Sequence, residues 1–235
     1  GHTKRVACVA FSQDGRRLAS ACHADEYSDR PLVEPGEVKG WDVATGEQNV
    51  VLQGAVGGVE GLTFSPDGGR IAAAGYENVS VWDATTGAMA LVLRAQASGF
   101  LGAVFSPDGR RLAAGTDRKI HIWDTATGRE SLTLRGHQQD IRSITLSPDG
   151  RRLASAGSDR VIRIWDATDS LYTDRLPGYG SNLQSVAFSS DGKKLATGSR
   201  DGTVRVWDPA AVRRLVETHG HTAPITCVAF SPEKG

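Results

Sequence analysis

The sequence predicts an all-β protein built from repeats of about forty residues, because three motif series recur along it in a fixed phase. All five tryptophans are followed by aspartate, at intervals of 41, 41, 42 and 42 residues. A second series of the type Phe-Ser-Pro-Asp-Gly marks six starts, and Gly-His precedes three of them by a constant distance. The Trp-Asp pairs begin at Trp41, Trp82, Trp123, Trp165 and Trp207.

Each repeat contains the pattern of four strands. The alternation in Val186–Phe188 predicts a first strand, and the Ser-Pro-Asp-Gly sequence that follows such strands is turn chemistry. A small-residue strand such as Leu153–Gly157 comes next, followed by a third strand such as Val161–Trp165. A Thr-Gly turn then leads to an outer strand such as Ser131–Leu134. Four antiparallel strands per repeat, arranged radially, form the blades of a β-propeller.

Composition excludes several classes of partner. The chain has 235 residues, with Lys+Arg 27 against Asp+Glu 27, so it lacks the basic footprint of a nucleic-acid or membrane-surface binder. No apolar run approaches the roughly 18 to 20 residues that cross a bilayer. Three cysteines do not make a disulfide framework, which fits a reducing compartment. We therefore expect a cytoplasmic protein with no nucleic-acid partner and no membrane partner.

With these motifs in phase, the sequence resembles the WD40 repeat family over essentially its whole length. The resemblance implies one propeller domain, 1–235, with five complete blades and one extra strand. The propeller is then part of a larger one of six to eight blades, seven being the commonest number in the family. A closed five-bladed ring with a spare strand is the alternative. The expected blades are 4–53, 57–94, 98–135, 139–177 and 181–219, and 222–235 would hold the first strand (Ile225 to Phe230) of a further blade.

The resemblance also implies a polar relay in each blade that links a Trp, a Ser or Thr, a His and a turn Asp. Such a relay satisfies the buried indole N–H and holds two loops together. Blades four and five are the most complete, so we expect them to be the most rigid. Their relay residues are His137, Ser155, Asp159 and Trp165, and Thr197, Asp201 and Trp207, with Tyr179 at the fifth His position.

The other three blades depart from this set. Blade one has its His, Ser and Trp, but an insertion obscures its turn acid. Blade two keeps only its Trp, and blade three keeps its Asp and Trp. The residues concerned are His2, Ser20 and Trp41; Ala55, Ala73, Tyr76 and Trp82; and Gln96, Ala114, Asp117 and Trp123.

In related propellers, the positions three and five residues after the His, and the residue before the turn Asp, face a partner. Arg and Tyr at such positions are favoured interface anchors, and acids and amides would set specificity. The alternative is a solvated rim with no dedicated partner. The candidate residues are Arg5, Glu60, Tyr76, Asp140, Arg142, Gln184 and Arg200.

Blade one is longer than the others, since Phe11 to Trp41 covers 30 residues whereas Phe64 to Trp82 covers 18. The surplus, 23–37, is acidic and rich in turn residues, and either contacts a partner or is a neutral insertion in a surface loop. No fixed ligand spacing supports Ca²⁺ binding there. Its candidate residues are Asp25, Glu26, Tyr27, Asp29, Arg30 and Glu34.

Other patterns favour structural roles. Basic pairs follow the turns at 16–17, 110–111, 151–152 and 193–194, each beside a turn acid, which favours a repeated solvated edge over a ring of cations that attracts an acidic ligand. Cys22-His23 and the pair His219 and His221 lack the spacing of a zinc site. No nucleophile, phosphate-loop or metalloprotease motif is present. We expect no metal, no cofactor and no catalysis.

The function that these observations favour is a rigid scaffold that presents loops to other proteins or peptides. The near-uniform Ser-Pro-Asp-Gly-Arg-Arg-Leu-Ala blocks resemble bacterial WD40 arrays, which are commonly appended to serine/threonine kinases or to signalling ATPases of the apoptosis-regulator type. That resemblance implies a sensor or scaffold region of a larger signalling protein. The alternative is a ligand- or metal-binding, or enzymatic, propeller that uses the central channel or the acidic loop 23–37.

Overall fold

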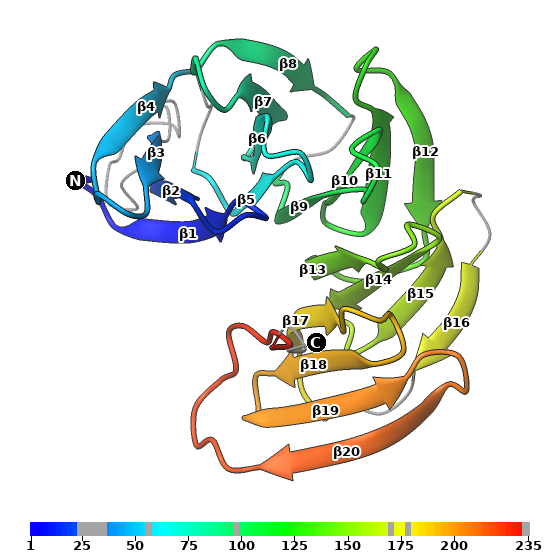
Figure 1. The fold of residues 1–235 in the computed structure, drawn as a ribbon. Coiled ribbons are helices and arrows are strands. Elements are labelled where there is room, and N and C mark those ends of the chain that lie inside the picture. Colours follow the sequence, from blue (N-terminus) through cyan, green and yellow to red (C-terminus); the bar gives the residue numbers. More distant parts are fainter. Residues whose placement is uncertain (23–36, 55–57, 96–98, 169–171, 177–179, 232–235) are drawn as a thin grey trace, which may run out of the picture. The chain divides into compact units, whose positions relative to one another are not determined.

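The predicted all-β fold is confirmed by a computed structural model, which describes residues 1–22, 37–54, 58–95, 99–168, 172–176 and 180–231. Every regular element in these residues is a strand, and the strands form five four-stranded antiparallel sheets in sequence order (Figure 1). In the described part of the chain, no helix is long and apolar enough to cross a membrane. The chain forms two compact units, residues 1–116 with 121–131, and residues 117–120 with 132–235.

The first two sheets lie in the first unit, and the third contributes residues to both units. The strands of the first sheet are β1 (Val6–Phe11), β2 (Arg17–Cys22), β3 (Val38–Asp42) and β4 (Gln48–Leu52). Those of the second are β5 (Gly61–Phe64), β6 (Arg70–Ala74), β7 (Val79–Asp83) and β8 (Met89–Leu93). Those of the third are β9 (Gly102–Phe105), β10 (Arg111–Gly115), β11 (Lys119–Asp124) and β12 (Glu130–Arg135).

The fourth and fifth sheets lie in the second unit. The strands of the fourth are β13 (Ile141–Leu146), β14 (Arg152–Gly157), β15 (Ile162–Asp166) and β16 (Tyr172–Leu176). Those of the fifth are β17 (Leu183–Phe188), β18 (Leu195–Ser199), β19 (Thr203–Asp208) and β20 (Arg213–His219).

The second strands form the centre of the packing because their side chains are small. Ala154 and Ala156 of β14 are fully buried, and they share a core cluster with Ile164, Val186 and Trp207. A methyl side chain lets the neighbouring sheet approach closely, and the large side chains of adjacent strands fill the remaining space. The outer strand β20, by contrast, is exposed along most of its length.

In every sheet, a serine and an aspartate close the turn between the first and second strands, as the turn between β13 and β14 of the fourth sheet illustrates. Ser147 Oγ donates to Asp149 Oδ1 at 2.5 Å, and the same carboxylate oxygen accepts the Arg151 N–H at 3.0 Å. Gly150 supplies the positive φ of 68° that the turn requires. The hydrogen bond from Ser147 is the main reason that the pKa of Asp149 lies below its ordinary value. The equivalent serines Ser12, Ser65, Ser106 and Ser189 make the same bond to Asp14, Asp67, Asp108 and Asp191.

The two residues of each Trp-Asp pair have separate tasks. The Trp123 side chain is fully buried, whereas Asp124 caps the turn to the outer strand. Asp124 Oδ1 accepts from the backbone N–H and the hydroxyl of Thr127, both at 2.8 Å. These two hydrogen bonds hold the pKa of Asp124 below its ordinary value. Asp42 and Asp83 cap the equivalent turns in the same way.

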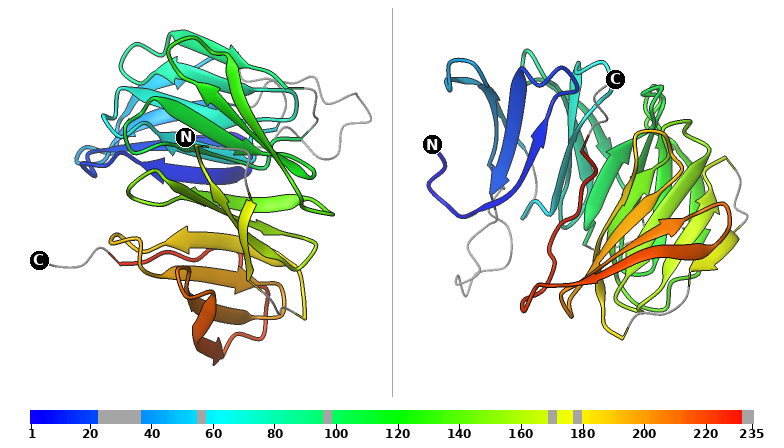
Figure 2. Two further views of the ribbon diagram at one scale, coloured as in Figure 1. Left: turned by 90° about the vertical axis from the view of Figure 1, so that its right-hand side faces the viewer. Right: turned by 60° about the horizontal axis from the view of Figure 1, so that its bottom comes forward.

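The expected strand at Ile225–Phe230 is not formed, although the segment lies where such a strand would begin a further sheet. Ile225 N–H donates to Ser199 O at 3.0 Å and Val228 N–H donates to Ser185 Oγ at 3.0 Å. Val186 N–H makes the equivalent bond to Ser143 Oγ, so the segment lies on the fifth sheet as β17 lies on the fourth. It runs beside β17 and β18 (red in Figure 2). Among the described residues no second strand of its own sheet pairs with it, and a ladder needs that partner.

We predict that Asp149→Asn lowers stability at neutral pH and that this difference disappears in acid. The lowered pKa means that Asp149 contributes its full stabilisation above the ordinary carboxyl pKa of about 3.9 and loses it as the pH falls through the folded value. The measurement is the urea midpoint of both proteins across this pH range. Asp174→Asn, in β16, is the control. A difference that stays constant into acid would contradict the prediction.

Candidate functional site

The four relay residues of the fourth sheet form one continuous hydrogen-bonded chain. Trp165 Nε1 donates to Ser155 Oγ at 2.8 Å, and His137 Nε2 lies 2.7 Å from the same oxygen. His137 Nδ1 lies 2.9 Å from Asp159 Oδ2, which also accepts the Gln138 N–H at 3.0 Å. The chain therefore ties the loop before β13 to the turn between β14 and β15.

The carboxylate of Asp159 is held in its ionised form. Burial raises the pKa of Asp159, but the hydrogen bonds from His137 and from the N–H groups of Gln138 and Val161 lower it. Their combined effect is larger than that of burial, so the pKa lies below its ordinary value. All of these donors belong to the relay or to the turn. Asp159 is therefore a structural anchor whose negative charge is already matched by its own loop.

In the fifth sheet, the structure joins only part of the predicted relay set. Trp207 Nε1 donates to Thr197 Oγ1 at 2.9 Å, and Thr197 Oγ1 also donates to Arg205 O at 3.3 Å. Asp201 accepts the Thr203 N–H at 3.0 Å within its own turn. The pKa of Asp201 is raised by burial but lowered more strongly by these turn hydrogen bonds. Thr197 takes the role that Ser155 has in the fourth sheet.

The first sheet has a complete relay whose acid the sequence analysis did not identify. Trp41 Nε1 donates to Ser20 Oγ at 2.7 Å, and His2 Nε2 lies 2.6 Å from that oxygen. His2 Nδ1 lies 2.8 Å from Glu37 Oε2, so Glu37 stands in the place of the turn aspartate. The insertion removes the usual spacing. An acid directly before the third strand was the available signal.

The second and third sheets have alanine where the relay has its hydroxyl. Trp82 Nε1 instead donates to the backbone oxygen of Gln53 at 2.9 Å. Trp123 Nε1 and His121 Nε2 are buried with no hydrogen-bond partner in the described part of the chain. An unpaired buried donor costs about 1–3 kcal/mol. Ala114 in the third sheet therefore leaves a fully buried indole N–H unsatisfied.

The predicted partner-facing residues are divided between the two units. Arg5, Glu60 and Tyr76 belong to the first unit and are exposed there. In the second unit, Arg142 donates from Nε to Ser158 Oγ at 3.0 Å and from Nη2 to Asp140 Oδ2 at 3.3 Å.

The other two predicted residues of the second unit lie at the fifth sheet. Arg200 is exposed, and its N–H donates to Asn182 O at 2.9 Å. Gln184 lies on β17 and is half-buried. The structure thus brings Asp140 and Arg142 together, with Arg142 touching Ser158 and Arg200 touching Asn182.

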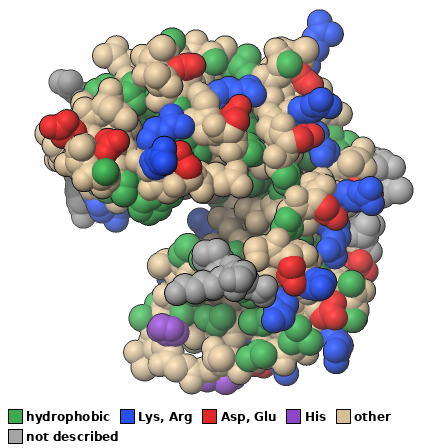
Figure 3. All heavy atoms as spheres, in the orientation of Figure 1, with side chains coloured by type: hydrophobic (Ala, Val, Ile, Leu, Met, Phe, Trp, Pro, Cys, Tyr) green, Lys and Arg blue, Asp and Glu red, His purple; other side chains and the backbone are tan. Residues whose placement is uncertain are grey.

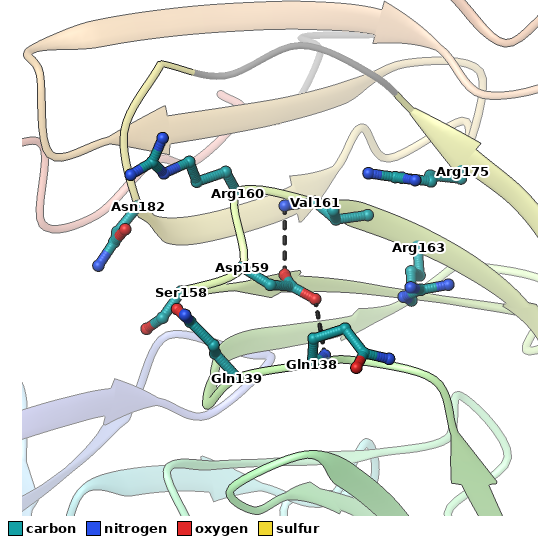
Figure 4. A pocket seen from close by; sticks show the side chains of 9 residues that line it. All are labelled: Gln138, Gln139, Ser158, Asp159, Arg160, Val161, Arg163, Arg175 and Asn182. Atoms are coloured by element: carbon teal, nitrogen blue, oxygen red, sulfur yellow. Dashed lines mark hydrogen bonds between the residues drawn. The ribbon is translucent and has the colours of Figure 1, made fainter.

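A pocket of about 450 Å³ opens in the second unit beside this pair (Figure 4). The loop before β13 and the turn between β14 and β15 form part of its wall. Two arginines from β15 and β16 and one residue before β17 complete it. Arg142 and Arg200 border the pocket through their hydrogen bonds to Ser158 and Asn182. Its lining residues are Gln138, Gln139, Ser158, Asp159, Arg160, Val161, Arg163, Arg175 and Asn182.

The charge of the pocket is positive. Among the described residues that line it, Asp159 is the only acid, and the relay already uses that carboxylate. Arg160, Arg163 and Arg175 line the pocket, and none of them was identified from the sequence. The sequence gives little indication of a shared site, because each arginine by itself is typical of an exposed turn or strand position. The pocket is therefore suited to an anionic group.

The sequence profile of the WD domain, G-beta repeat, matches six segments of the chain. They cover residues 1–27, 46–83, 90–124, 128–166, 170–208 and 213–234. The chain belongs to the WD40 repeat family. No curated protein matches it. WD40 proteins generally mediate protein–protein interactions as scaffolds and are generally not enzymes.

The WD40 repeat is offset from the sheet by one strand. The matched segment 128–166 holds β12, the outer strand of the third sheet, together with β13, β14 and β15 of the fourth. The four middle matched segments thus each supply strands to two successive sheets. Within such a repeat, the segment between the outer strand of one sheet and the first strand of the next links the two sheets covalently.

The basic pairs after the turns of this WD40 chain have two distinct environments. In the pairs 16–17 and 151–152, the second member packs on an aromatic ring of the next sheet: Arg17 lies 5.6 Å from the Phe64 ring and Arg152 lies 5.7 Å from the Phe188 ring. The first members, such as Arg151, are exposed beside the turn acids. On the face in Figure 3, Lys and Arg side chains lie interspersed with Asp and Glu. This mixture favours the solvated edge over an anion-binding ring.

Several residues that the sequence analysis singled out lie outside the described residues. Among these are three residues at the relay His positions and the candidate residues of the acidic loop. They are Ala55, Gln96 and Tyr179, and Asp25, Glu26, Tyr27, Asp29, Arg30 and Glu34.

We predict that Ala114→Ser raises the free energy of unfolding by about 1 kcal/mol, because the new hydroxyl accepts the hydrogen bond that the Trp123 indole lacks. Ala114 occupies the register position of Ser155, so the hydroxyl stands where a relay hydroxyl normally stands. Urea denaturation measures the change. Ala72→Ser, at a buried position of the neighbouring sheet, is the matched control and should destabilise. Equal effects at both positions would refute this account of Trp123.

Proposed function

We propose that this WD40 chain is a protein-interaction module that binds an acidic segment of a partner protein at the arginine-lined pocket of the fourth sheet. The pocket joins the loops that the sequence analysis assigned to the partner-facing end. It is also shaped by the most complete relay of the second unit. Three features of this chain support the proposal, and each can be compared with the fifth sheet.

The observation that carries the proposal is a cross-strand pair of like charges. Arg163 of β15 lies directly opposite Arg175 of β16. At the equivalent position of the fifth sheet, Arg205 lies opposite Glu217, and the two form an ion pair at 2.8 Å. Like charges directly opposite each other destabilise a sheet. A carboxylate from a partner that binds both Arg163 and Arg175 would offset this like-charge repulsion.

Arg160 adopts a backbone conformation that a side chain makes unfavourable. Its φ is 65°, and the equivalent turn residue of the fifth sheet is Gly202, with a φ of 83°. A residue other than glycine in the left-handed region costs roughly 1–2 kcal/mol. Strain of this kind is concentrated at functional sites. The chain therefore has an arginine at the rim of the pocket, at a position where glycine would cause less backbone strain.

The relay makes the pocket a prepared surface. His137 and Asp159 hold the turn that carries Arg160, and Ser158 holds Arg142. Guanidinium groups that are already placed lose little freedom when a carboxylate binds, and each binds a carboxylate through two parallel hydrogen bonds. Arg142 and Arg200, which the sequence analysis favoured as anchors, extend the cationic surface beyond the pocket.

The proposal includes the wider role that the sequence resemblance implies. The near-uniform repeat blocks support a scaffold or sensor region of a larger bacterial signalling protein in the cytoplasm. An acidic partner segment is compatible with either a neighbouring domain of that protein or a separate chain.

The test uses fluorescein-labelled synthetic peptides of graded Glu and Asp content, with binding measured by anisotropy. We predict that acidic peptides bind and that Arg175→Glu weakens their binding at least tenfold, because the new glutamate pairs with Arg163 as Glu217 pairs with Arg205. The same variant should be at least as stable as the wild type, so a folding defect cannot explain the loss. Arg151→Glu, at the opposite turn, is the charge-matched control.

The control should leave binding unchanged, and binding should weaken as salt screens the charges. Failure of every acidic peptide to bind would overturn the proposal. So would equal binding by the wild type and Arg175→Glu.

We predict that Arg160→Gly increases stability and decreases affinity for acidic peptides. Removal of the side chain relieves the left-handed strain, which gives a gain of about 1 kcal/mol in the free energy of unfolding. The lost guanidinium should weaken peptide binding severalfold. Thermal and urea unfolding measure the first effect, and anisotropy measures the second. Gly202→Ala, the reverse change in the fifth sheet, should destabilise. A variant that gains stability and retains full affinity would remove Arg160 from the binding surface.

A further inference from the structure

Three side chains with metal-binding atoms converge in the first sheet. His2 lies before β1, Cys22 is the last residue of β2, and Glu37 directly precedes β3. Their ligand atoms all lie within 4.8 Å of one another. Cys22 is 1% exposed, and the side chains of His2 and Glu37 are 5% and 35% exposed. A nitrogen, a sulfur and a carboxylate oxygen are the ligand types that Zn²⁺ uses.

The relay alone does not account for the sulfur. Cys22 pairs with Val6 as Gly157 pairs with Ile141, so Gly157 marks the same position in the fourth sheet. A Cβ built at Gly157 would lie 2.7 Å from His137 Nδ1 and 2.6 Å from Asp159 Oδ1. A side chain at this position therefore points at the histidine–acid pair. The fourth sheet leaves the position empty, whereas the first sheet places a thiol there.

The longer acid of the first sheet makes room for that thiol. Glu37 reaches His2 from a position next to β3, whereas Asp159 reaches His137 from within the turn. The positions that correspond to Cys22 in the second, third and fifth sheets hold Gly75, Thr116 and Ser199. Among the five sheets, the first combines the histidine, the acid and a cysteine at these positions.

The surrounding residues orient the three ligands. Ser20 Oγ lies 2.6 Å from His2 Nε2, and the tautomer with its proton on Nε2 donates to Ser20 and leaves Nδ1 to bind an ion. Lys39 Nζ lies 2.7 Å from Glu37 Oε1, while Oε2 faces His2. The hydrogen bond from Lys39 is the largest cause of the lowered pKa of Glu37, so this carboxylate is ionised at neutral pH. Metal ligands in proteins are held by hydrogen bonds of this kind.

We propose that His2 Nδ1, Cys22 Sγ and Glu37 Oε2 bind a Zn²⁺ ion. Zinc bond lengths of about 2.0 to 2.3 Å separate tetrahedral ligand atoms by roughly 3 to 4 Å, which small side-chain rotations achieve from the observed cluster. Binding releases the thiol proton of Cys22. Zn²⁺, one thiolate and one carboxylate sum to zero charge, which a largely buried site tolerates. Three protein ligands leave a fourth position for water.

The proposal differs from the sequence-based expectation that the chain binds no metal. That expectation rested on the spacing of two pairs along the chain, Cys22-His23 and His219 with His221. The proposed ligands come instead from three segments that the fold brings together. The inference is independent of the acidic-peptide proposal, because the ligands lie in the first unit and the pocket lies in the second.

The test titrates Zn²⁺ and Co²⁺ into the metal-free full chain, prepared without a histidine tag and with an acetylated N-terminus so that the Gly1 amine supplies no ligand. We predict one equivalent of Zn²⁺ with a higher melting temperature, and a thiolate-to-cobalt charge-transfer band with Co²⁺. Cys22→Ser should abolish the band, and Cys22→Ser and Glu37→Gln should each weaken Zn²⁺ binding at least about tenfold. Cys227→Ser, at an exposed cysteine, is the matched control and should change neither readout.

Circular dichroism of the metal-free variants establishes that they are folded. If Cys22→Ser does not fold, Glu37→Gln decides, because its amide retains the size of the glutamate but is a much poorer ligand. Absence of stoichiometric binding overturns the site. Binding that survives both substitutions, or that is lost with Cys227→Ser, also overturns it.

Discussion

The tryptophan of each repeat imposes the constraint on which the rest of the structure depends. It is buried in the second to fifth sheets and half-buried in the first. Its ring fills the space between sheets, and its indole N–H then needs an acceptor where water is absent. In the first, fourth and fifth sheets a hydroxyl of the second strand is that acceptor. In the first and fourth sheets a histidine and an acid continue the chain from that hydroxyl to a loop. The same hydrogen-bonded chain therefore satisfies the tryptophan in the core and fixes the position of the loop.

Because the repeats share this frame, departures from it mark the positions on which both proposals rest. Arg175 stands where the fifth sheet has Glu217, and Arg160 stands where it has Gly202. Each departure has a physical cost, either like-charge repulsion or left-handed strain. Cys22 stands where the fourth sheet has Gly157. The surrounding geometry is the same in each sheet, so these side chains differ while their positions in the fold do not.

Much of the fold could be predicted because the signals are local and repeated. Ser-Pro-Asp-Gly specifies its turn through a serine, an aspartate and a glycine that are adjacent in sequence, and the Trp-Asp and Thr-Gly motifs specify the next. The expectation of a strand at Ile225–Phe230 was wrong because a strand also requires a pairing partner. The acid of the first relay, Glu37, could not be assigned because the first repeat is longer than the others between Ser20 and its third strand, so the usual spacing does not locate the acid.

The sequence by itself determined the repeat, the order of the strands, their turns and the residues available for each relay, because all of these depend on spacing along the chain. The tertiary structure alone decided which charges oppose each other and which atoms converge. Arg163 lies opposite Arg175 in the pairing of β15 with β16. His2, Cys22 and Glu37 meet because the segment before β1, the end of β2 and the residue before β3 lie together at one end of the first sheet. Such proximity depends on pairing in three dimensions, and linear spacing does not encode it.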